Sequence, residues 1–428
     1  MAVPLPDFLD RDALTALQAR KLRRLLDEAL PSNVFLSGKF ARAGMKADSN
    51  FSLSDLRQLP FTTKAELSAD QQAFPPYGRN LTYPLDCYCR LHQTSGTTTG
   101  QPLRWLDTLE SWFQLVGFWE SFFRMTGVTA ADRLFFPFSF GPFLGFWTAF
   151  EAAARQGIFC LPAGGMSSSA RLRFLMENQA TVILCTPTYA LRLAEVAAQD
   201  GIDLSASSVR ALIVAGEPGG SIGATRSRIE AAWGARVFDH YGLTEIGPVA
   251  IECQEQPGGL HILESSYIVE VINPTDGQLV APGQVGELVL SNLDRIGSPI
   301  LRYRTGDLVR NDPGACTCRR TFTRLEGGVL GRVDDMIHLR GNNLYPSALE
   351  AVIRRFAEVV EYRVEIDAAG PLAVARIEVE LSQPTPRLTE RIAQAIRDDL
   401  LFRADVIDVP AGSLPRHEMK AKRIHIKK

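Results

Sequence analysis

Short hydrophobic runs and amphipathic segments alternate through the middle of the chain, and this alternation constrains the fold more than any other feature. The hydrophobic runs, rich in Val, Ile, Leu or Phe, lie at 133–138, 157–161, 181–185 and 209–215. Segments with apolar residues at helical spacing separate them, near 145–156, 170–178 and 189–199. Right-handed crossovers between such strands give a mostly parallel sheet covered by helices. The sequence therefore predicts an α/β fold.

The segments on either side of this region have different patterns of apolar and turn-forming residues. Residues 10–30 have the spacing of a surface helix, and Asp107 is expected to cap a second helix that carries Trp112 and Trp119. Strands at 268–272 and 286–290 flank a stretch rich in Pro and Gly, which predicts a β subregion. The last hundred residues predict a small α+β domain, with helices at 347–356 and 389–400 and strands at 362–366 and 373–381.

Composition excludes several classes of protein. The chain has 428 residues, 46% of them hydrophobic and 22% charged, which is typical of a soluble globular protein. Its net charge of −2 gives no general attraction to nucleic acid or to anionic membranes. The apolar run 134–150 contains Pro137 and Pro142 and is too short to span a bilayer. We expect neither nucleic acid nor membrane as a partner.

The amino terminus and the cysteines indicate the compartment. Residues 1–7 lack the basic start and the apolar stretch of a secretory signal, so a cytoplasmic location is expected. The seven cysteines are an odd number in a large chain, which favours free thiols or a metal site over a disulfide framework.

A hydroxyl-rich loop is the first motif that carries chemistry. It runs from Thr94 to Gly100 as Thr-Ser-Gly-Thr-Thr-Thr-Gly, and its backbone N–H groups and hydroxyls can surround a polyphosphate. It is not a Walker motif, because no Lys-Ser or Lys-Thr follows the last glycine. Taken alone, such a loop is more typical of a linker.

Four further motifs follow along the chain. Residues 239–245 (Asp-His-Tyr-Gly-Leu-Thr-Glu) offer a ring to stack on a base, a hydroxyl for a phosphate and a carboxylate for a hard cation. Residues 303–307 end in Asp307, which can accept bonds from ribose hydroxyls. The others are 331–336 with 340–346, and 412–416 with 419–423.

In this order and spacing, the five motifs resemble those of the adenylate-forming superfamily of acyl-CoA synthetases, peptide-synthetase adenylation domains and luciferases. The Gly-Glu-Pro-Gly-Gly stretch at 216–220 and the Cys/His pattern between 252 and 318 look like the phenylacetate-CoA ligase branch. The resemblance covers residues 85–428 and is weakest over the first eighty residues.

The resemblance implies a reaction and a domain plan. A carboxylate attacks the α-phosphorus of ATP to give an acyl-adenylate and pyrophosphate, and a thiol then displaces AMP. The implied large domain is 1–333, in which 1–80 is the least certain part, with mostly parallel sheets and a β subregion. Residues 335–428 are the implied small mobile α+β lid, which swings about a hinge at Asp334. Spacing alone would favour reading Asp334 as a helix or turn cap.

The resemblance also implies roles for individual residues. Lys420, Thr244 and Glu245 are the implied catalytic residues, with Glu245 as the Mg²⁺ ligand. The implied ATP-binding residues are Thr94, Ser95, Gly96, Thr97, Thr98, Thr99, Gly100, Gly216, Glu217, Pro218, Asp239, His240, Tyr241, Gly242, Asp307 and Arg332. One departure concerns a lysine that many members carry after the loop's proline. Here Leu103 and Arg104 follow Pro102, and Arg104 is the candidate substitute.

Three cysteines and a histidine form a candidate zinc site. Cys316-x-Cys318 is a weak metal signal by itself, but Cys253 and His261 supply the two further ligands that a closed tetrahedral Zn²⁺ site needs. The site would be structural and not catalytic. The alternative is four unligated residues close to one β subregion.

Aromatic residues favour an aromatic carboxylic acid as the substrate. By resemblance the segment 135–147 borders the acyl pocket, and its candidate lining residues are Phe138, Phe140, Gly141, Phe143, Gly145 and, from the later motif, His240. The leading hypothesis is an ATP-, Mg²⁺- and CoA-dependent aryl-CoA or arylacetate-CoA ligase. A carrier-protein thiol or an amine as acceptor, and a nucleotide-binding scaffold without turnover, are the alternatives. The identity of the acid and a homodimeric state stay open.

Overall fold

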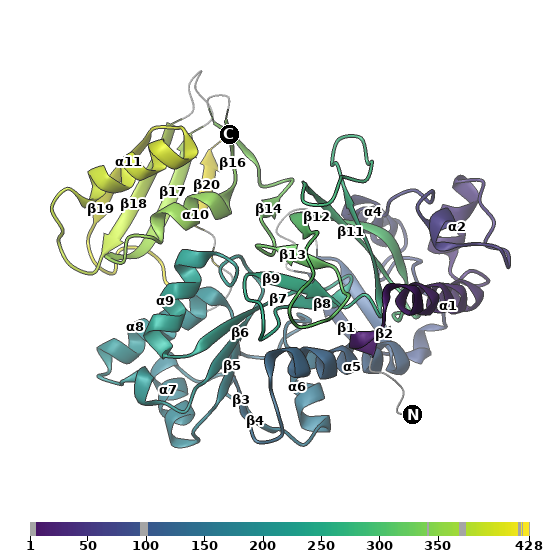
Figure 1. The fold of residues 1–428 in the computed structure, drawn as a ribbon, viewed down its shortest axis with the longest axis horizontal. Helices are drawn as coiled ribbons and strands as arrows, with labels where there is room; N and C mark the ends of the chain where they lie inside the picture. Colours follow the sequence, from purple (N-terminus) through teal and green to yellow (C-terminus); the bar gives the residue numbers. More distant parts are fainter. Residues whose placement is uncertain are drawn as a thin grey trace. The chain divides into compact units, whose positions relative to one another are not determined.

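A short 3₁₀ helix (Pro6–Phe8) precedes helix α1 (Arg11–Ala29) in a computed structural model of the chain (Figure 1). The structure describes residues 6–94, 102–339, 342–367, 374–417, 421 and 423–427. Its internal contacts divide the chain into two units, which we call unit 1 (1–165 and 240–328) and unit 2 (166–239 and 329–428). Each unit is described by itself below.

The N-terminal helices of unit 1 pack on a shared apolar core. Asp10 caps α1 by accepting a bond from the N–H of Ala13, and Leu22, Leu25 and Leu26 are buried. The helix expected over 10–30 is therefore confirmed. The core also takes in α2 (Val34–Arg42) and α3 (Leu53–Leu56), together with Leu293, Ile296 and Leu301. Helix α4 (Lys64–Ala73) follows, with Thr63 as its N-cap.

The hairpin of β1 (Tyr88–Gln93) and β2 (Arg104–Thr108) leads into α5 (Leu109–Thr126). The expectation that Asp107 caps this helix is wrong. Thr108 is the N-cap, since its side chain accepts the bond from the N–H of Ser111. Trp112 and Trp119 are buried on the inner face of α5. Gly127 ends the helix at a φ of 68°, in the left-handed region that favours glycine.

Parallel strands and helices alternate as predicted. In unit 1, β3 (Arg133–Phe136) pairs in parallel with β4 (Phe159–Pro162), and α6 (Trp147–Arg155) connects them. In unit 2, β5 (Val182–Cys185) and β6 (Ala211–Val214) form a parallel pair. The helices of this unit 2 region are α7 (Ser168–Glu177), α8 (Pro187–Gln199) and α9 (Gly223–Trp233).

Strand β7 (Arg236–Leu243) belongs to both units. Its first half, up to Asp239, pairs in parallel with β6. Its second half, from His240, pairs antiparallel with β8 (Gly247–Ile251). The chain thus changes from parallel to antiparallel pairing in the middle of one strand.

An antiparallel region follows β8 in unit 1 and confirms the predicted β subregion. The strand order is β10-β11-β12-β13-β9-β8. The strands are β9 (Gly259–Ile262), β10 (Tyr267–Ile272), β11 (Val285–Asn292), β12 (Ile300–Asp312) and β13 (Arg324–Glu326). The expected hairpin is the β10–β11 pair, which begins at Tyr267↔Asn292.

The last hundred residues form the predicted α+β arrangement in unit 2. A sheet of order β19-β18-β17-β20 has an antiparallel centre and two parallel outer pairs. Its strands are β17 (Val359–Asp367), β18 (Val374–Leu381), β19 (Ala404–Val409) and β20 (Ile424–Lys427). Helices α10 (Pro346–Ile353) and α11 (Leu388–Leu400) supply Leu349, Ile353 and Ile392 to its core. Before them come β14 (Gly331–Arg332), β15 (Ile337–Leu339) and β16 (Asn342–Leu344).

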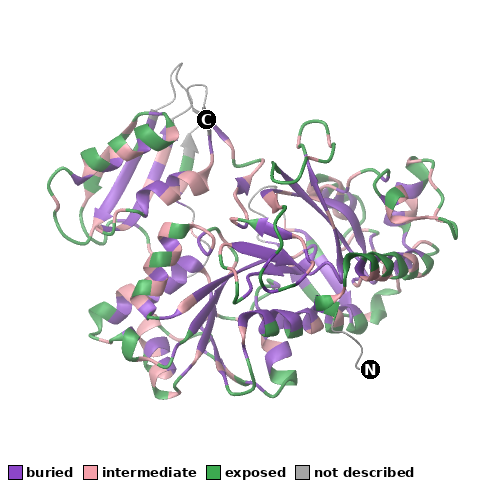
Figure 2. Cartoon of the chain, in the orientation of Figure 1, coloured by how far each residue is buried: buried purple, intermediate pink, exposed green. Residues whose placement is uncertain are grey.

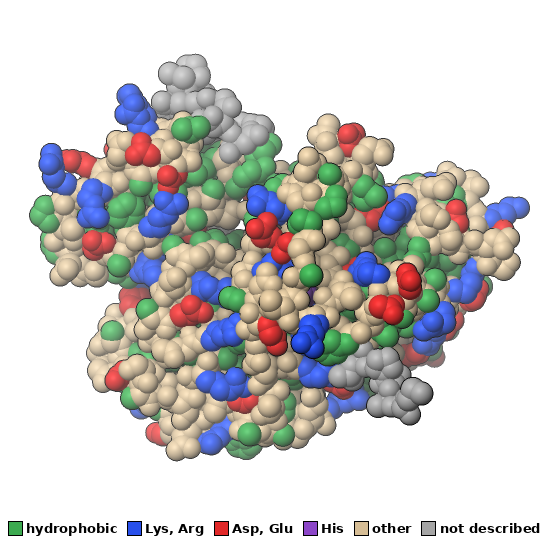
Figure 3. Space-filling model, in the orientation of Figure 1, with side chains coloured by type: hydrophobic (Ala, Val, Ile, Leu, Met, Phe, Trp, Pro, Cys, Tyr) green, Lys and Arg blue, Asp and Glu red, His purple; other side chains and the backbone are tan. Residues whose placement is uncertain are grey.

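Burial differs between the strands and the helices, and charged side chains of both signs lie on the surface. Figure 2 shows that the central strands are largely buried while helices expose their outer faces. On the face shown in Figure 3, basic and acidic side chains are interspersed. Within the described part of the chain, none of the helices is both long and apolar enough to cross a bilayer.

Candidate active site

Thr244 and Glu245 lie in the tight turn of the β7–β8 hairpin. The turn spans residues 244–246 and is closed by a bond from the N–H of Ile246 to the carbonyl of Leu243, at 3.2 Å. Glu245 is only 4% exposed, and its carboxylate accepts a bond from the hydroxyl of Tyr303 at 3.2 Å. A buried carboxylate with so few partners has oxygen lone pairs left for a hard cation.

Lys64 is a residue that sequence reasoning missed. Its Nζ lies 3.9 Å from Oε1 of Glu245, and its side chain is 30% exposed. The backbone of Thr62 explains this placement, because it pairs with β12: the N–H of Thr62 donates to the carbonyl of Arg302, and its own carbonyl accepts from the N–H of Arg304. This long-range pairing brings the start of α4 beside Glu245, so no local motif could have revealed it.

Tyr241 and Asp307, from two separate motifs, meet in unit 1. The hydroxyl of Tyr241 donates to Oδ2 of Asp307 at 2.6 Å, and both side chains are buried. Strand β12 has an irregular register just before Asp307, where Gly306 has a φ of 76°, and the hydroxyl of Thr305 accepts a bond from the N–H of Asp307. The structure therefore joins the aromatic ring expected near adenine to the carboxylate expected near ribose.

The β1–β2 hairpin carries the hydroxyl-rich loop. Its base is closed by the pair Gln93↔Arg104 and by a bond from the N–H of Thr94 to the carbonyl of Leu103. Ser95, Gly96, Thr97, Thr98, Thr99 and Gly100 lie outside the described residues. Arg104, the candidate substitute for a lysine, is exposed and donates to the carbonyl of Pro76 at 3.1 Å.

Gly216, Glu217, Pro218 and Asp239 lie in unit 2. The carboxylate of Glu217 accepts bonds from the N–H groups of Thr188 and Ala421, each at 2.8 Å. Asp239 accepts a bond from the hydroxyl of Ser221. A Cβ at Gly220 would lie 2.5 Å from Oδ1 of Asp239, so this position has room only for glycine.

The expected hinge residue forms a local ion pair in unit 2. Asp334 is exposed and accepts bonds from Nε and Nη2 of Arg332, at 2.9 and 3.2 Å. Arg332, expected to contact ATP, is thus held by the hinge residue in this structure. Lys420 lies outside the described residues.

An aromatic cluster in unit 1 surrounds His240. The centroid of its ring lies 4.7 Å from that of Trp119, 5.2 Å from that of Phe122 and 6.3 Å from that of Phe146. Nδ1 of His240 lies 2.9 Å from the carbonyl oxygen of Ala250. Burial lowers the pKa of His240 to about 4, although the bond to Ala250 acts in the opposite direction. The ring is therefore neutral at pH 7.

The segment expected to border the acyl pocket continues this cluster. The ring of Phe138 lies 5.6 Å from that of Phe146 and 5.0 Å from that of Phe140, which is 4.5 Å from Trp147. Phe143 is 40% exposed, and Gly141 and Gly145 are exposed as well. Phe138 and Phe140 thus connect to the rings around His240, whereas Phe143 faces solvent.

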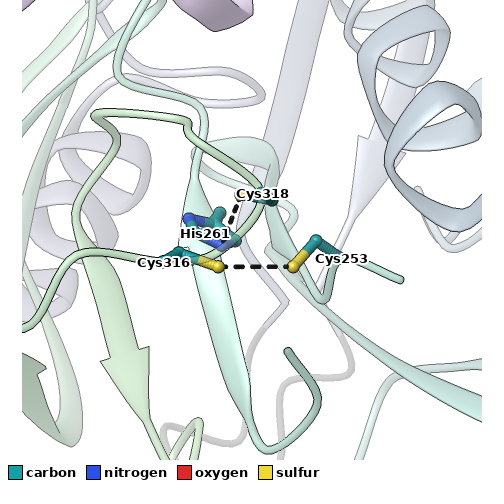
Figure 4. Close-up of side chains that lie close together, drawn as sticks. All are labelled: Cys253, His261, Cys316 and Cys318. Atoms are coloured by element: carbon teal, nitrogen blue, oxygen red, sulfur yellow. Dashed lines mark hydrogen bonds between the residues drawn. The ribbon is translucent and has the colours of Figure 1, made fainter. Parts of the chain in front are cut away.

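Cys253, His261, Cys316 and Cys318 come together in unit 1, all buried (Figure 4). His261 lies on β9, Cys253 follows β8, and the other two lie between β12 and β13. The four ligand atoms lie within 4.8 Å of one another, with 3.6 Å between Sγ of Cys253 and Sγ of Cys316 and 3.6 Å between Sγ of Cys318 and Nε2 of His261. A tetrahedral zinc site with bonds near 2.3 Å has sulfur–sulfur edges of about 3.8 Å. The donor set and its spacing fit zinc.

The cysteines of this Cys₃His cluster differ in acidity. Burial raises the pKa of Cys253 to about 12. Burial acts the same way on Cys318, but the hydrogen bond with His261 and backbone bonds outweigh it and lower the pKa of Cys318 to about 6. Zinc would bind these cysteines as thiolates, so its uptake would release protons.

Comparison with known proteins gives consistent matches along the chain. Residues 15–293 match the AMP-binding enzyme family, and residues 341–428 match the C-terminal domain of AMP-binding enzymes. The phenylacetate-coenzyme A ligase of Escherichia coli (strain K12) is 33% identical over 428 residues, which cover 96% of this chain and 94% of that protein. Its counterpart in Thermus thermophilus is 32% identical over 452 residues, 98% of this chain and 97% of that protein.

Solved structures show the same fold. A 2-hydroxyisobutyryl-CoA ligase in its postadenylation state superimposes with a TM-score of 0.93 at 26% identity, covering 99% of this chain and 91% of that one. The same ligase with an adenylate and CoA, in its thioesterification state, gives a TM-score of 0.75 at 26% identity, covering 98% and 91%.

Proposed function

Because this chain belongs to the AMP-binding enzyme family, we propose that it activates an aromatic carboxylic acid with ATP and transfers the acyl group to CoA. It is an acid–thiol ligase of the AMP-forming type, with an acyl-adenylate as its intermediate. ATP and CoA are its co-substrates. The resemblance to the adenylate-forming superfamily, and to its phenylacetate-CoA ligase branch, that the sequence motifs indicated is thereby confirmed.

One observation carries the proposal furthest: the buried Glu245 and the Tyr241–Asp307 pair occur together in unit 1. Three groups from two segments, the β7–β8 hairpin and β12, are each suited to a different part of a nucleotide and are held by buried bonds. We assign the ribose to Asp307, the adenine to Tyr241 with Gly216, Glu217 and Pro218, and the α-phosphate to Thr244. The loop 94–100 is assigned to the β and γ phosphates.

The carboxylate of Glu245 is a suitable ligand for Mg²⁺. A hard cation takes oxygen ligands, and the buried carboxylate offers them beside the neutral hydroxyl of Tyr303. When bound, Mg²⁺ offsets the charge that develops on the phosphates. Lys64 adds a second positive charge near the same carboxylate, and we assign it to the phosphate side of the site.

The aromatic cluster is the proposed acid site. Neutral His240 and its neighbouring rings suit a flat apolar group and avoid burying a charge beside it. The relatives named phenylacetate-coenzyme A ligase favour an arylacetate or a related aromatic acid. We place Phe138 and Phe140 nearer the acid than Phe143, since only the first two contact the cluster through described rings.

Zinc in the Cys₃His cluster is a second part of the proposal. The ligands come from the β8–β9 connection, from β9 and from the loop after β12, so one ion would tie together segments that are distant in sequence. No group of the adenylation site is among the ligands, which favours a structural role.

We also propose a mobile lid about Asp334. The 2-hydroxyisobutyryl-CoA ligase that resembles this chain is known in postadenylation, open and thioesterification states. By analogy, residues 335–428 would carry Lys420 toward the carboxylate and α-phosphate for the first half-reaction and away from them for the second. A cytoplasmic location suits an enzyme that uses ATP and CoA. A homodimer stays a prediction, which a measurement of the molecular mass in solution would test.

The test is pyrophosphate release from ATP with a panel of acids. We expect release with phenylacetate or another aromatic acid, little release with aliphatic acids of similar size, and thioester formation only after CoA is added. Adenylation without thioester formation from CoA would redirect the proposal to a carrier-protein thiol or an amine. No pyrophosphate with any acid, from protein that binds ATP, would overturn it in favour of a nucleotide-binding scaffold.

A further inference from the structure

The carbonyl oxygens of the turn 244–246 are held by buried side chains. Nη1 of Arg295 donates to the carbonyl of Thr244 at 2.7 Å, and Nδ2 of Asn292 donates to the carbonyl of Ile246 at 2.6 Å. The hydroxyl of Tyr267 donates to the carbonyl of Pro248 at 2.7 Å, just beyond the turn. Arg295, Asn292 and Tyr267 are each 0% exposed. The turn is therefore fixed on both sides of Glu245.

Arg295 is itself fixed by Asp107. Nε and Nη2 of Arg295 donate to the two carboxylate oxygens of Asp107, each at 2.6 Å, and neither side chain is exposed. Such bidentate pairs set the plane of the guanidinium. Burying an ion pair costs desolvation energy, so an apolar pair of similar volume is often equally stable or more so. Stability alone is thus a weak explanation for this pair.

The position of Asp107 links two parts of the nucleotide site. Asp107 lies on β2, the strand that leaves the hydroxyl-rich loop, and pairs across the hairpin with Arg90. Arg295 therefore binds the strand behind the loop and the carbonyl of Thr244 at the same time. One guanidinium fixes the distance between the hairpin assigned to the β and γ phosphates and the turn assigned to the α-phosphate.

Asn292 completes the arrangement. Its Oδ1 accepts bonds from the N–H groups of Asp294 and Arg295, at 2.9 and 3.1 Å. The same amide that holds the carbonyl of Ile246 therefore also shapes the backbone from which Arg295 projects. The end of β11 and the loop that follows it therefore present two donors to one turn.

We propose that Asp107, Asn292 and Arg295 are positioning residues that set the turn 244–246 against the β1–β2 hairpin for adenylation. The inference rests on the proposed function of this site. None of the three is assigned a contact with substrate, so they act through Thr244 and Glu245. A displacement of about 1 Å at a reacting centre can cost a hundredfold in rate, which gives such a scaffold a large effect.

The decisive variant is the double substitution Asp107→Leu with Arg295→Met. It removes both charges, avoids an unpaired buried charge, and deletes the bond to the carbonyl of Thr244. The matched control is Glu270→Leu with Arg302→Met. Arg302 makes the same bidentate contact with Glu270, at 2.9 and 2.8 Å, but its remaining nitrogen donates to the carbonyl of Leu59.

We expect both double variants to melt within a few degrees of the parent. In D107L/R295M, the kcat for pyrophosphate release should fall by about tenfold to a hundredfold while the KM for the acid stays close to that of the parent. The control should keep its kcat within about threefold. Amide exchange in residues 243–248 should become faster in D107L/R295M and not in the control.

Two results would overturn the inference: a kcat and exchange rate in D107L/R295M that match the parent, or equal losses in both double variants. Arg295→Lys provides the same readouts if the double variant does not fold, because its single ammonium keeps a charge beside Asp107 but cannot reproduce both contacts. If the parent releases no pyrophosphate with any acid, the proposed function fails, and the exchange data still decide whether Arg295 holds the turn.

Discussion

At the scale of single residues, the surroundings of Glu245 define its task most clearly. The carboxylate is buried, yet the polar groups beside it among the described residues are a hydroxyl at 3.2 Å and an ammonium at 3.9 Å, and neither makes the short bidentate contact seen in the structural pairs. Asp107 and Glu270 are fully engaged by arginines, whereas Glu245 keeps free coordination capacity. This difference separates a candidate cation ligand from the carboxylates that hold the fold.

Glu245→Gln should weaken the Mg²⁺-dependent first half-reaction. A neutral amide is a poor ligand for a hard cation, so pyrophosphate release should slow and the Mg²⁺ concentration needed for half-maximal rate should rise. The matched control is Glu255→Gln, which removes the same charge at an exposed position. Equal rates for Glu245→Gln and the parent across a Mg²⁺ titration would refute the assignment.

Lys64→Met should slow adenylation with little effect on folding. The Lys64–Glu245 contact is long, at 3.9 Å, so its loss should cost little stability, but a positive charge beside the phosphates lowers the barrier to phosphoryl chemistry. We expect a loss of roughly tenfold or more in kcat and a melting temperature close to that of the parent. Lys46→Met, at an exposed position, is the control. An unchanged kcat would remove Lys64 from the site.

The buried histidines should make the protein sensitive to acid. Burial lowers the pKa of His240 and of His92 to about 4, below the usual 6.5 of an unfolded histidine. Unfolding therefore takes up protons between pH 6.5 and 4, and the free energy of unfolding falls as the pH drops through this window. Each group contributes roughly 3 kcal/mol to the total loss.

His240→Phe and His92→Phe should each reduce this acid sensitivity. Urea unfolding at pH 7 and at pH 4.5 measures it as the difference in unfolding free energy between the two conditions. The difference should shrink in either variant and shrink further when both substitutions are combined. If the difference in unfolding free energy is unchanged in both variants, other titratable groups cause the loss of stability at low pH.

The sequence predicted these residues unevenly. Thr244, Glu245, Tyr241 and Asp307 sit in short contiguous motifs, so their chemistry was readable before any contact was known. Lys64 and Arg295 were not found, because their partners Glu245 and Asp107 lie more than a hundred residues away in the sequence. Asp107 was predicted from its neighbours in the sequence to cap a helix, but its carboxylate instead accepts a hydrogen bond from the distant Arg295.

At the scale of elements, hydrophobic periodicity located the helices and strands within a few residues. The helix expected over 189–199 begins two residues earlier, at Pro187, because Thr186 provides its N-cap. The strand expected over 133–138 ends at Phe136, since Pro137 cannot donate to a ladder. Cap chemistry and proline, rather than periodicity, set these boundaries.

Zinc should accompany the purified protein at about one equivalent per chain. The Cys₃His cluster brings its four ligand atoms within 4.8 Å of one another, so an ion would tie β9 to the loop after β12. Removing it should lower the melting temperature by roughly 5 °C or more. Cys316→Ser should lose zinc, and Cys87→Ser, at an exposed cysteine, should retain it. Identical melting of zinc-loaded and zinc-free protein would show that the ion is not a structural staple.

At the scale of the whole molecule, the family assignment covers both ends of the chain, and its relatives align over nearly all of its length. The sequence motifs were sufficient to predict the fold class and the reaction type. They could not give the acid, because the shape of an aromatic pocket depends on side-chain packing between segments as distant as α5 and β7.

Lys420→Ala should separate the two half-reactions. If Lys420 bridges the carboxylate and the α-phosphate only during adenylation, acyl-adenylate formation should fall by about a hundredfold or more. Thioester formation from supplied acyl-adenylate and CoA should persist, since the lid would have carried Lys420 away. Lys422→Ala is the control within the same basic segment. Equal damage to both half-reactions, or none to either, would exclude Lys420 from catalysis.

Strand β7 has a consequence for how such an enzyme can be altered. Asp239 and His240 are consecutive residues of one strand, so their side chains point to opposite faces, one toward Ser221 and the other into the aromatic cluster. If His240 lines the acid site and Asp239 the adenine, as proposed, a substitution at His240 alters the choice of acid without replacing the side chain that faces the nucleotide. Losing or gaining a single residue before Asp239 would exchange the two faces and alter both sites together. On these assignments, substitution of His240, and not insertion or deletion, is the route by which the enzyme can take a new acid.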